Sequence, residues 1–550
     1  MKFPPLGDQV KALLVWPEVP KSFWTILMPG AKERSAVPPL GLLTIAALCP
    51  KSWTIRFIDE QVEEVRDEHV REAELVMVSG MQVQKDSIKK VLLRARALGK
   101  RTIIGGPYVS SEPDSVLPLA DHIVIGEPDA VFRRIAAELE CGTGQRVYVV
   151  DEKPDVTCTP VPRFDLLKMD RYATMAVQFS RGCPFQCEFC DIISLYGRTP
   201  RTKQPEQVLA ELESLFKLGA SRCLWWTTIS SGIRNEPWNC CTVCRGGRSH
   251  TISHFSFFTE ASIDLAQRPA LVDAMVKANF FGVFVGIESP SPESLKETKK
   301  FQNLRADPIE SIKFLNAHGL WVSGGFIIGF DSDKEDIFER QREFVERTAI
   351  PWAMLAFLQA PPTTPLYRRM QQEGRITDDF SGNFNLPNFR TMLPFPVLVE
   401  GFSETLRSLY GASSYFNRCF HSLSRWTPQG QKPPALQLLP AARMLLSALW
   451  YQGICSDYRS EWWKSVYEAR RWIRDPMKRW MALLLLASGH HFIHHSRKVV
   501  SQLHAELRKA ISGQLDPATA GAGNEAMRPA YNHDGFEAAV KTPRCSEYPA

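Results

Sequence analysis

The segment Phe179-Ser-Arg-Gly-Cys183-Pro-Phe-Gln-Cys187-Glu-Phe-Cys190 decides the fold that we expect of this chain. Its thiols are separated by three and then two residues, beside a glycine and a proline. Short, sharply turning segments of this kind hold iron–sulfur clusters through cysteine thiolates. Three ligands leave one iron of a four-iron cube without a protein donor, and an open coordination position is typical of catalytic metal sites. We therefore predict a catalytic [4Fe–4S] cluster at Cys183, Cys187 and Cys190.

Two simpler interpretations account less well for these cysteines. Free cysteine is a common small apolar residue of protein cores, but spacing this tight rarely arises from core packing. A structural zinc site needs a fourth Cys or His ligand, and the neighbouring sequence offers none. The iron–sulfur cluster is favoured over both.

The cysteine spacing, and the aromatic Phe189 directly before Cys190, resemble the radical S-adenosylmethionine (SAM) superfamily. The resemblance implies that the open iron chelates the amino and carboxylate groups of SAM, and that Phe189 lies near the adenine. It also implies an electron donor of the flavodoxin or ferredoxin type as a partner.

Upstream, short β-branched runs alternate with helical stretches, which indicates a parallel sheet with crossover helices. The expected strands are Lys11–Trp16, Thr54–Ile58, Glu74–Ser79, Arg101–Ile104 and His122–Ile125. Such sheets bind ligands in the loops at the carboxyl ends of their strands. The candidate residues in these loops are Ser79, Gly80, Met81, Gly105, Gly106, Pro107, Gly126 and Glu127. No Gly-x-Gly-x-x-Gly fingerprint identifies a dinucleotide, so the motif alone leaves the ligand open.

Four stretches of this region, Pro38–Ala47, Ser79–Met81, Gly105–Tyr108 and Ile125–Pro128, resemble the cobalamin-binding domain that precedes the cluster in one radical SAM class. The resemblance implies that the candidate loop residues bind cobalamin. Many cobalamin domains carry Asp-x-His-x-x-Gly, whose histidine ligates cobalt. Here Asp121-His122 is adjacent and begins an expected strand, so the resemblance implies a lower axial position without that histidine.

Six strand–helix repeats are expected downstream, which predicts a partial barrel, open on one side, with its site at the carboxyl ends of the strands. The strands are expected near Thr174–Phe179, Ser221–Trp226, Ser256–Ala261, Phe280–Ile287, Trp321–Phe330 and Trp352–Gln359. A helix from Pro205 presents one apolar face, formed by Val208, Leu212, Leu215 and Phe216. The residues expected to meet SAM or the substrate are Glu260, Glu288, Gly324 and Gly325. The alternative is that the two acids only cap helices or close turns.

Residues 226–254 break this rhythm, because they show neither helical nor strand periodicity where a barrel helix is expected. A zinc site at Cys240, Cys241 and Cys244 with nearby histidines is a weak alternative. Trp225 and Trp226 have only one codon each, and a shift of frame there permits Val-Asp followed by Asp-Asn-Phe-Ile-Gly-Asn. The resembled family carries such an acidic turn at this point, so our hypothesis is a frameshift near Trp225 that is reversed near Phe255.

The region after Pro365 shows helical apolar spacing. The expected helices are Leu398–Tyr410, Pro434–Tyr451, Glu461–Arg474 and Pro476–His491. A helical extension of this kind accompanies the resembled family and would cover the open side of the barrel. The run Gly489-His-His-Phe-Ile-His-His495 offers metal-binding pairs, but a solvated helix end is favoured.

The fold class expected is therefore α/β, and the chain divides into five parts. They are a Rossmann-like cobalamin-binding domain (8–150), a linker (151–173), a partial (β/α)6 radical SAM core (174–368), an α-helical domain (369–511) and a disordered tail (512–550). The net charge of +6, from 66 basic and 60 acidic residues, gives no reason to expect nucleic acid. Thirteen scattered cysteines and an N-terminus without an apolar core favour the cytoplasm. Apolar runs are too short for a transmembrane helix, although a peripheral membrane association stays open.

The resemblance implies an enzyme that carries a [4Fe–4S] cluster, SAM and cobalamin and methylates an unactivated carbon of a small-molecule substrate. In that mechanism a 5′-deoxyadenosyl radical takes a hydrogen atom, and cobalamin supplies the methyl group. One alternative is a cobalamin-dependent radical cyclisation or rearrangement. Another is a catalytically silent cofactor-binding protein, because of residues 226–254.

Overall fold

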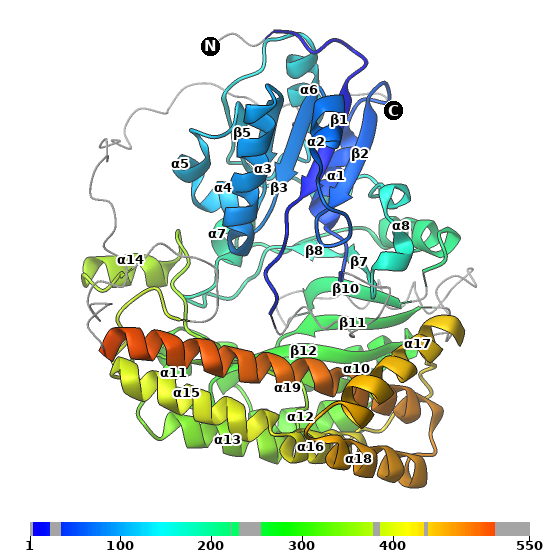
Figure 1. Ribbon diagram of the computed structural model, residues 1–550, viewed down its shortest axis with the longest axis vertical. Coiled ribbons are helices and arrows are strands. Elements are labelled where there is room, and N and C mark those ends of the chain that lie inside the picture. Colours follow the sequence, from blue (N-terminus) through cyan, green and yellow to red (C-terminus); the bar gives the residue numbers. More distant parts are fainter. Residues whose placement is uncertain are drawn as a thin grey trace.

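The structure is a computed structural model that describes residues 4–22, 35–220, 222–229, 255–377, 386–433 and 438–511. Two parallel six-stranded sheets follow one another along the chain, and a helical region follows the second sheet (Figure 1). The N-terminal sheet lies at the top of the view, the second sheet lies across the middle, and the helices lie below (Figure 1). The expected α/β fold class with a helical C-terminal region is thus confirmed.

The first sheet has the strand order β2-β1-β3-β4-β5-β6. Its strands are β1 (Lys11–Trp16), β2 (Thr54–Asp59), β3 (Leu75–Ser79), β4 (Arg101–Gly105), β5 (His122–Gly126) and β6 (Val147–Val150). Its helices are α1 (Leu40–Leu48), α2 (Asp67–Glu72), α3 (Lys85–Ala97), α4 (Pro107–Ser111), α5 (Pro113–Val116) and α6 (Phe132–Glu140). Apolar cores form on both faces of the sheet. Because the order reverses between β1 and β3, their carboxyl ends open a crevice that suits a ligand.

The segment between the sheets, expected as a linker, packs against both of them. Phe164 is buried in the core of the second sheet, and Arg163 N–H donates to the carbonyl of Leu43 on α1 at 3.1 Å. The Tyr172 hydroxyl donates to Asp59 at the end of β2 at 3.1 Å. Burial raises the pKa of Asp59 to about 6.

The second sheet keeps its strands in chain order, β7-β10-β11-β12-β13-β14. They are β7 (Met175–Gln178), β10 (Arg222–Ile229), β11 (Ser256–Ala261), β12 (Phe280–Glu288), β13 (Trp321–Ile328) and β14 (Ala353–Phe357). The helices are α7 (Ile192–Tyr196), α8 (Pro205–Lys217), α10 (Pro269–Lys277), α11 (Pro292–Glu297), α12 (Pro308–Ala317) and α13 (Ile337–Thr348), and β8 (Ser180–Arg181) pairs with β9 (Arg201–Thr202). Among the described strands β7 and β14 do not pair, so the barrel is partial, as predicted.

Two expectations for this region need comment. On α8 the predicted apolar face is buried at Val208, Leu212 and Leu215, but Phe216 is exposed because it lies just outside that stripe. The possible zinc ligands at 240–254, and all but the first four residues of the irregular segment, lie outside the described residues. Strand β10 runs on to Ile229, and its pairing with β11 shifts register between Trp225 and Thr228.

The helical region consists of α14 (Pro365–Gln372), α15 (Phe395–Tyr410), α16 (Ala412–Arg425), α17 (Leu438–Ala448), a π-helix (Leu449–Ile454), α18 (Arg459–Trp472) and α19 (Pro476–Ile511). Helices α15, α16 and α18 contact α19, which runs along the sheet side of this layer (Figure 1). The Phe402 ring of α15 stacks on Phe357 of β14 at 3.9 Å between centroids. In the part of the chain that the structure describes, no helix is long and apolar enough to cross a membrane.

The interpretation of the histidine run as a solvated helix end is wrong. Helix α19 continues through this run to Ile511, and at Gly489 a Cβ would lie 2.9 Å from the Phe416 ring. Burial lowers the pKa of His490 and of His495 to about 4. His490 and His495 are therefore partly buried in the middle of a helix, whereas His494 is exposed.

Candidate functional site

The predicted cluster ligands lie on one loop, residues 183–190, which we call the cysteine loop. It follows β8, and Cys183 N–H donates to the carbonyl of Gly197 at 3.1 Å. Gly182, directly before it, has a φ of +91°, and a Cβ there would lie 2.6 Å from the carbonyl oxygen of Thr199. Only glycine permits this turn, so the backbone conformation directly before the cysteine loop is fixed.

The three thiols are close enough to influence one another. Cys187 is buried, and Cys183 and Cys190 are partly buried. Burial raises the pKa of the Cys183 and Cys190 thiols, and the Cys187 thiol raises both further. Within the described ranges no three His, Cys, Asp or Glu side chains are spaced for a single metal ion. A four-iron cube takes each thiolate on a different iron, and coordination deprotonates the thiols.

A buried ion pair lies beside the cysteine loop. The Lys300 ammonium contacts the carboxylate of Glu288, and about a tenth of each side chain is exposed. Burial opposes the positive charge, but Glu288 and then Cys187 raise the pKa of Lys300. The Lys300 nitrogen also lies 5.8 Å from the centre of the Phe189 ring. Lys300 thus lies near the thiols of the cysteine loop, near Phe189, which is the predicted neighbour of adenine, and near Glu288, which is a predicted SAM ligand.

The end of β12 is shaped around this pair. A Cβ on Gly286 would lie 2.5 Å from Glu288 Oε1 and 2.8 Å from Lys300 Nζ. Glu288 itself has a φ of +64°, and such strain persists where the surrounding structure imposes it, often at functional sites. Gln302, close to Lys300 in sequence, donates to Cys187 Sγ at 3.4 Å. Residues 286–302 therefore form one wall behind the cysteine loop.

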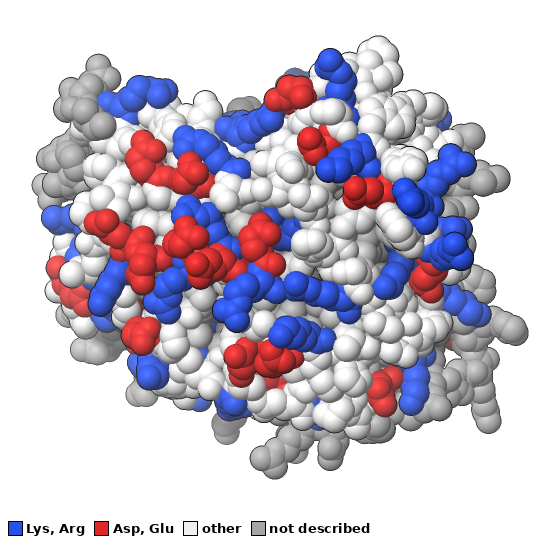
Figure 2. All heavy atoms as spheres, turned by 90° about the horizontal axis from the view of Figure 1, so that it is seen from below, with Lys and Arg blue, Asp and Glu red and all other residues white. Residues whose placement is uncertain are grey.

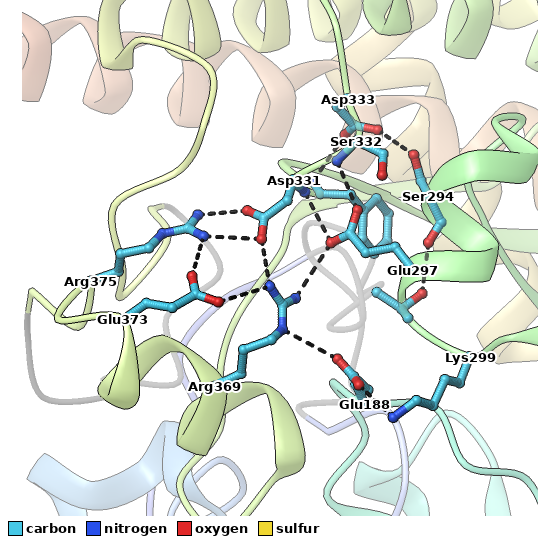
Figure 3. Close-up of polar contacts among 12 residues, drawn as sticks. Glu188, Ser294, Glu297, Lys299, Asp331, Ser332, Asp333, Arg369, Glu373 and Arg375 are labelled. Atoms are coloured by element: carbon cyan, nitrogen blue, oxygen red, sulfur yellow. Dashed lines mark hydrogen bonds and ion pairs between the residues drawn. The ribbon is translucent and has the colours of Figure 1, made fainter.

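Glu188 fastens the cysteine loop to its surroundings (Figure 3). Its carboxylate lies 2.8 Å from Lys299 Nζ and 3.5 Å from Arg369 Nε. Its N–H donates to the carbonyl of Thr298 at 3.0 Å, and its carbonyl accepts from Leu366 N–H at 3.1 Å. Both its backbone and its side chain are therefore held.

The same network reaches the loop after β13 (Figure 3). Arg369 on α14 and Arg375 each lie 2.6 Å from a carboxylate oxygen of Asp331, and they lower its pKa although burial opposes them. Glu373 bridges the two arginines, at 3.7 Å and 2.8 Å. Helix α14 is thereby joined both to the cysteine loop and to the end of β13.

Strand register divides the remaining predicted SAM ligands. Glu260 pairs with Phe284, and Gly286 pairs with Gly325, so these four residues face the side that carries the buried ion pair. Gly324 faces away from it. These site assignments stay predictions.

Glu260 and Gly324 differ in their surroundings. The Glu260 side chain is partly accessible, and burial raises the pKa of its carboxyl to about 7. A Cβ on Gly324 would lie 2.8 Å from the buried Ile287 side chain, so this glycine permits close packing between strands. Glu260 is the better placed of the two for chemistry.

The glycine-rich loops of the first sheet lie next to one another, after β3, β4 and β5. Tyr108 N–H donates to the carbonyl of Gly80 at 3.2 Å, and Gly126 N–H donates to Ser110 Oγ at 2.9 Å. Gly106 has a φ of +96°, and a Cβ there would overlap the hydroxyl of Ser79. The predicted loop residues are therefore brought together.

The other predicted residues of this group lie around these loops. Gly105 ends β4, and Pro107 begins α4. Met81 is 39% exposed, which leaves an apolar side chain available at the crevice. His122 is buried at the first residue of β5, so it lies at the opposite ends of the strands from these loops. It cannot serve as an axial cobalt ligand from there, as the sequence indicated.

Glu127 joins the two sheets. Its carboxylate lies 2.9 Å from Arg181 on β8 and 2.8 Å from Arg201 on β9, the two paired strands between which the cysteine loop lies. Arg181 also pairs with Asp129 at 2.7 Å. All of these side chains are largely buried. The loop after β5 therefore contacts the two strands that flank the cysteine loop, and the role of Glu127 in binding cobalamin stays a prediction.

Together these features define the class of protein. A switch-point crevice with glycine-rich loops lies against an open barrel that presents three thiols and a buried ion pair, the arrangement of an enzyme that brings two cofactors together. The sequence matches the models of the B12 binding domain over residues 29–136, the radical SAM superfamily over 177–345, and a domain of unknown function (DUF4070) over 364–505. The chain belongs to the family of cobalamin-binding radical SAM proteins. Cobalamin, SAM and a [4Fe–4S] cluster, the cofactors predicted from the sequence, are those of its two matched cofactor domains.

Relatives match nearly the whole chain. The chain is 37% identical to an uncharacterized methyltransferase of Synechocystis (sll1242) over 92% of its length and 95% of that protein. It is 30% identical to the hopanoid C-2 methylase of Rhodopseudomonas palustris over 89% of its length and 94% of that protein. Identity falls to 23% with a bacteriochlorophyllide d C-12(1)-methyltransferase of Chlorobaculum tepidum, over 72% of this chain and 89% of that one.

Solved structures share the fold. The cobalamin-dependent SAM radical enzyme OxsB has a TM-score of 0.57 at 15% identity, and the alignment covers 92% of this chain and 81% of that one. The radical SAM methyltransferase TsrM of Kitasatospora setae also has a TM-score of 0.57, at 14% identity, over 84% of this chain and 99% of that one.

Sequence reasoning did not find Lys300, Gln302, Glu188 and Arg369 as parts of the site. Lys299 and Lys300 look like an exposed charged run, and nothing in the local pattern shows that the second is buried against Glu288. The position of Glu188 between two cysteines was the one signal available.

Proposed function

We propose that this protein is a radical SAM methyltransferase that adds a methyl group to an unactivated carbon. The observation that carries the proposal is the contact of Glu127, in the loop after β5 of the cobalamin-type sheet, with Arg181 and Arg201 on the two strands that flank the cysteine loop. When bound, the cluster and SAM supply a 5′-deoxyadenosyl radical and cobalamin supplies the methyl group, so the protein need only bind, orient and exclude water.

In this proposal the cluster is held by Cys183, Cys187 and Cys190. The acids Glu260 and Glu288, with Gly325 beside them, face the groups of SAM or of the substrate. Lys300 places a buried cation beside the thiolates, where it would offset part of their negative charge. Met81 and the glycine-rich loops of the first sheet would contact cobalamin.

We further propose a large, apolar, polycyclic substrate of the hopanoid kind. The support is the similarity to the hopanoid C-2 methylase, which extends over 94% of that protein. The bacteriochlorophyllide methyltransferases are more distant.

The test uses anaerobically purified full-length protein, reconstituted with iron, sulfide and cobalamin and incubated with reductant, a hopanoid and SAM that carries a deuterated methyl group. We expect 5′-deoxyadenosine and a product that contains the deuterated methyl group. A Cys187→Ala variant should make neither. Formation of 5′-deoxyadenosine without label in the product would favour cyclisation or rearrangement. Absence of both from the wild-type protein would favour a catalytically silent one.

A further inference from the structure

The exposed aromatic side chains of this protein gather in one place. Every exposed Trp or Tyr whose side chain the structure describes lies between Trp450 and Trp472. With the exposed aliphatic residues around them they form the aromatic–basic face of α17, the π-helix and α18. Its apolar members are Leu445, Leu446, Trp450, Tyr451, Ile454, Trp463, Tyr467 and Trp472. Apolar side chains concentrated in this way on a surface mark an interaction site.

Cations alternate with the aromatic residues of this face. The exposed side chains of α18 include Arg459, Lys464, Arg470 and Arg471, whereas its acids, Glu461 and Glu468, are turned partly inward. None of these four cations forms an ion pair with a residue in the described ranges. This differs from much of the surface, where red and blue side chains lie side by side (Figure 2).

The face is rigid. The Trp463 indole N–H donates to the carbonyl of Gly453 in the π-helix at 3.0 Å. A Cβ on Gly453 would lie 2.8 Å from the buried Trp462 ring, so the absence of a side chain there lets α18 pack closely. The Arg471 guanidinium lies 4.9 Å from the centre of the Trp472 ring. These contacts hold α18 against the π-helix and fix the Trp463 ring.

We propose that the aromatic–basic face docks on an anionic lipid bilayer. Trp and Tyr favour the boundary between hydrocarbon and headgroups, and each Lys or Arg near an anionic leaflet adds about 1 kcal/mol. A second copy of the chain fits less well, because a two-fold contact would set the same unpaired cations against one another. The inference goes beyond the proposed methyl transfer and does not depend on it.

The experiment is flotation of the full-length, cofactor-loaded protein with vesicles of phosphatidylcholine, with and without phosphatidylglycerol. We expect binding that requires the anionic lipid and weakens with salt. The variant Lys464→Glu/Arg470→Glu/Arg471→Glu should bind at least about tenfold more weakly. The control variant Arg133→Glu/Lys217→Glu/Lys277→Glu reverses three exposed cations elsewhere, for the same change in net charge, and should bind as the wild type does.

A second variant, Tyr467→Ser/Trp472→Ser, should lose the binding that remains at high salt, where charge is screened. The cobalamin and cluster absorption of each variant should equal that of the wild type, which shows that it is folded. Equal binding of the wild type and the charge-reversed variant would overturn the proposal. Failure of the wild type to bind vesicles would also overturn the proposal, whatever covers the face instead.

Discussion

The two six-stranded sheets are both parallel, but they differ in the loops at the carboxyl ends of their strands. In the first sheet the order reverses between β1 and β3, so a crevice arises from topology and its loops need only glycines that fit close together. In the second sheet the strands keep their chain order, and the site is marked by the buried ion pair of Lys300 with Glu288 and by the partly accessible Glu260 carboxyl. At the carboxyl ends of the strands, the first sheet is shaped by backbone geometry and the second sheet by electrostatics.

The largest loss of stability should come from removing one partner of the buried Lys300–Glu288 ion pair in the second sheet. Lys300→Met leaves the Glu288 carboxylate buried without its partner, which costs about 3–5 kcal/mol of unfolding free energy. Lys300→Met/Glu288→Met removes both charges and should recover most of that loss. Thermal and denaturant unfolding of the full chain measure both. A double variant as unstable as the single one would show that the pair is not electrostatically coupled.

In the first sheet, the glycine-rich loops at the carboxyl ends of the strands should be destabilised by the addition of a single methyl group. In Gly126→Ala the added Cβ overlaps the carbonyl of Val150, at a φ of +93°, so we expect a loss of about 1–3 kcal/mol and weaker retention of cobalamin. The matched control is Gly99→Ala, which has a φ of +66° but open space around it. It should cost only about 1–2 kcal/mol and leave cobalamin unaffected. Equal cobalamin loss in both would remove the special role of the loop after β5.

A smaller effect is expected where the cysteine loop is fastened. Glu188→Gln weakens two partly exposed ion pairs, each worth up to about 1 kcal/mol, and should speed the loss of iron to a chelator several-fold. Glu373→Gln is the control, since Glu373 pairs with the same Arg369 but lies outside the cysteine loop. It should leave iron retention unchanged. If both variants release iron equally fast, the network acts as a whole and Glu188 has no special position.

The smallest effect should appear as a pH dependence. Burial raises the pKa of Glu260 to about 7, against 4.5 when it is free, so the folded protein holds this proton more tightly than the unfolded chain does. The resulting stabilisation is present below about pH 4.5 and is lost as pH rises through 7. It amounts to about 1 kcal/mol, because solvent reaches part of the side chain. Thermal unfolding at several pH values should show the slope in the wild type and a shallower one in Glu260→Gln.

Periodicity predicted most of the architecture. Lys11–Trp16 and Ser256–Ala261 were predicted with their observed bounds, because short runs rich in apolar and aromatic residues indicate buried strands. Helix α19 was ended too early, at His491, whereas it runs on to Ile511. The packing of Phe416 against Gly489 lies inside this helix and leaves no sign in the local sequence.

The candidate site was predictable only where its residues lie close together in sequence. The cysteines and the glycine-rich loops are local motifs. Lys300 and Arg369 were missed because their partners, Glu288 and Glu188, lie 12 and 181 positions away and meet them only in the folded domain. A charged side chain carries no local sign that it will be buried.

The contact between Glu127 and the β8–β9 hairpin has a consequence for assembly. Swinging the two sheets apart would strip Glu127 and Asp129 of Arg181, and leaving buried charges unpaired costs several kcal/mol. The separation of the two cofactor-binding edges is therefore set by the polypeptide before any cofactor arrives. Cobalamin and SAM would therefore meet two sheets whose relative position is already determined.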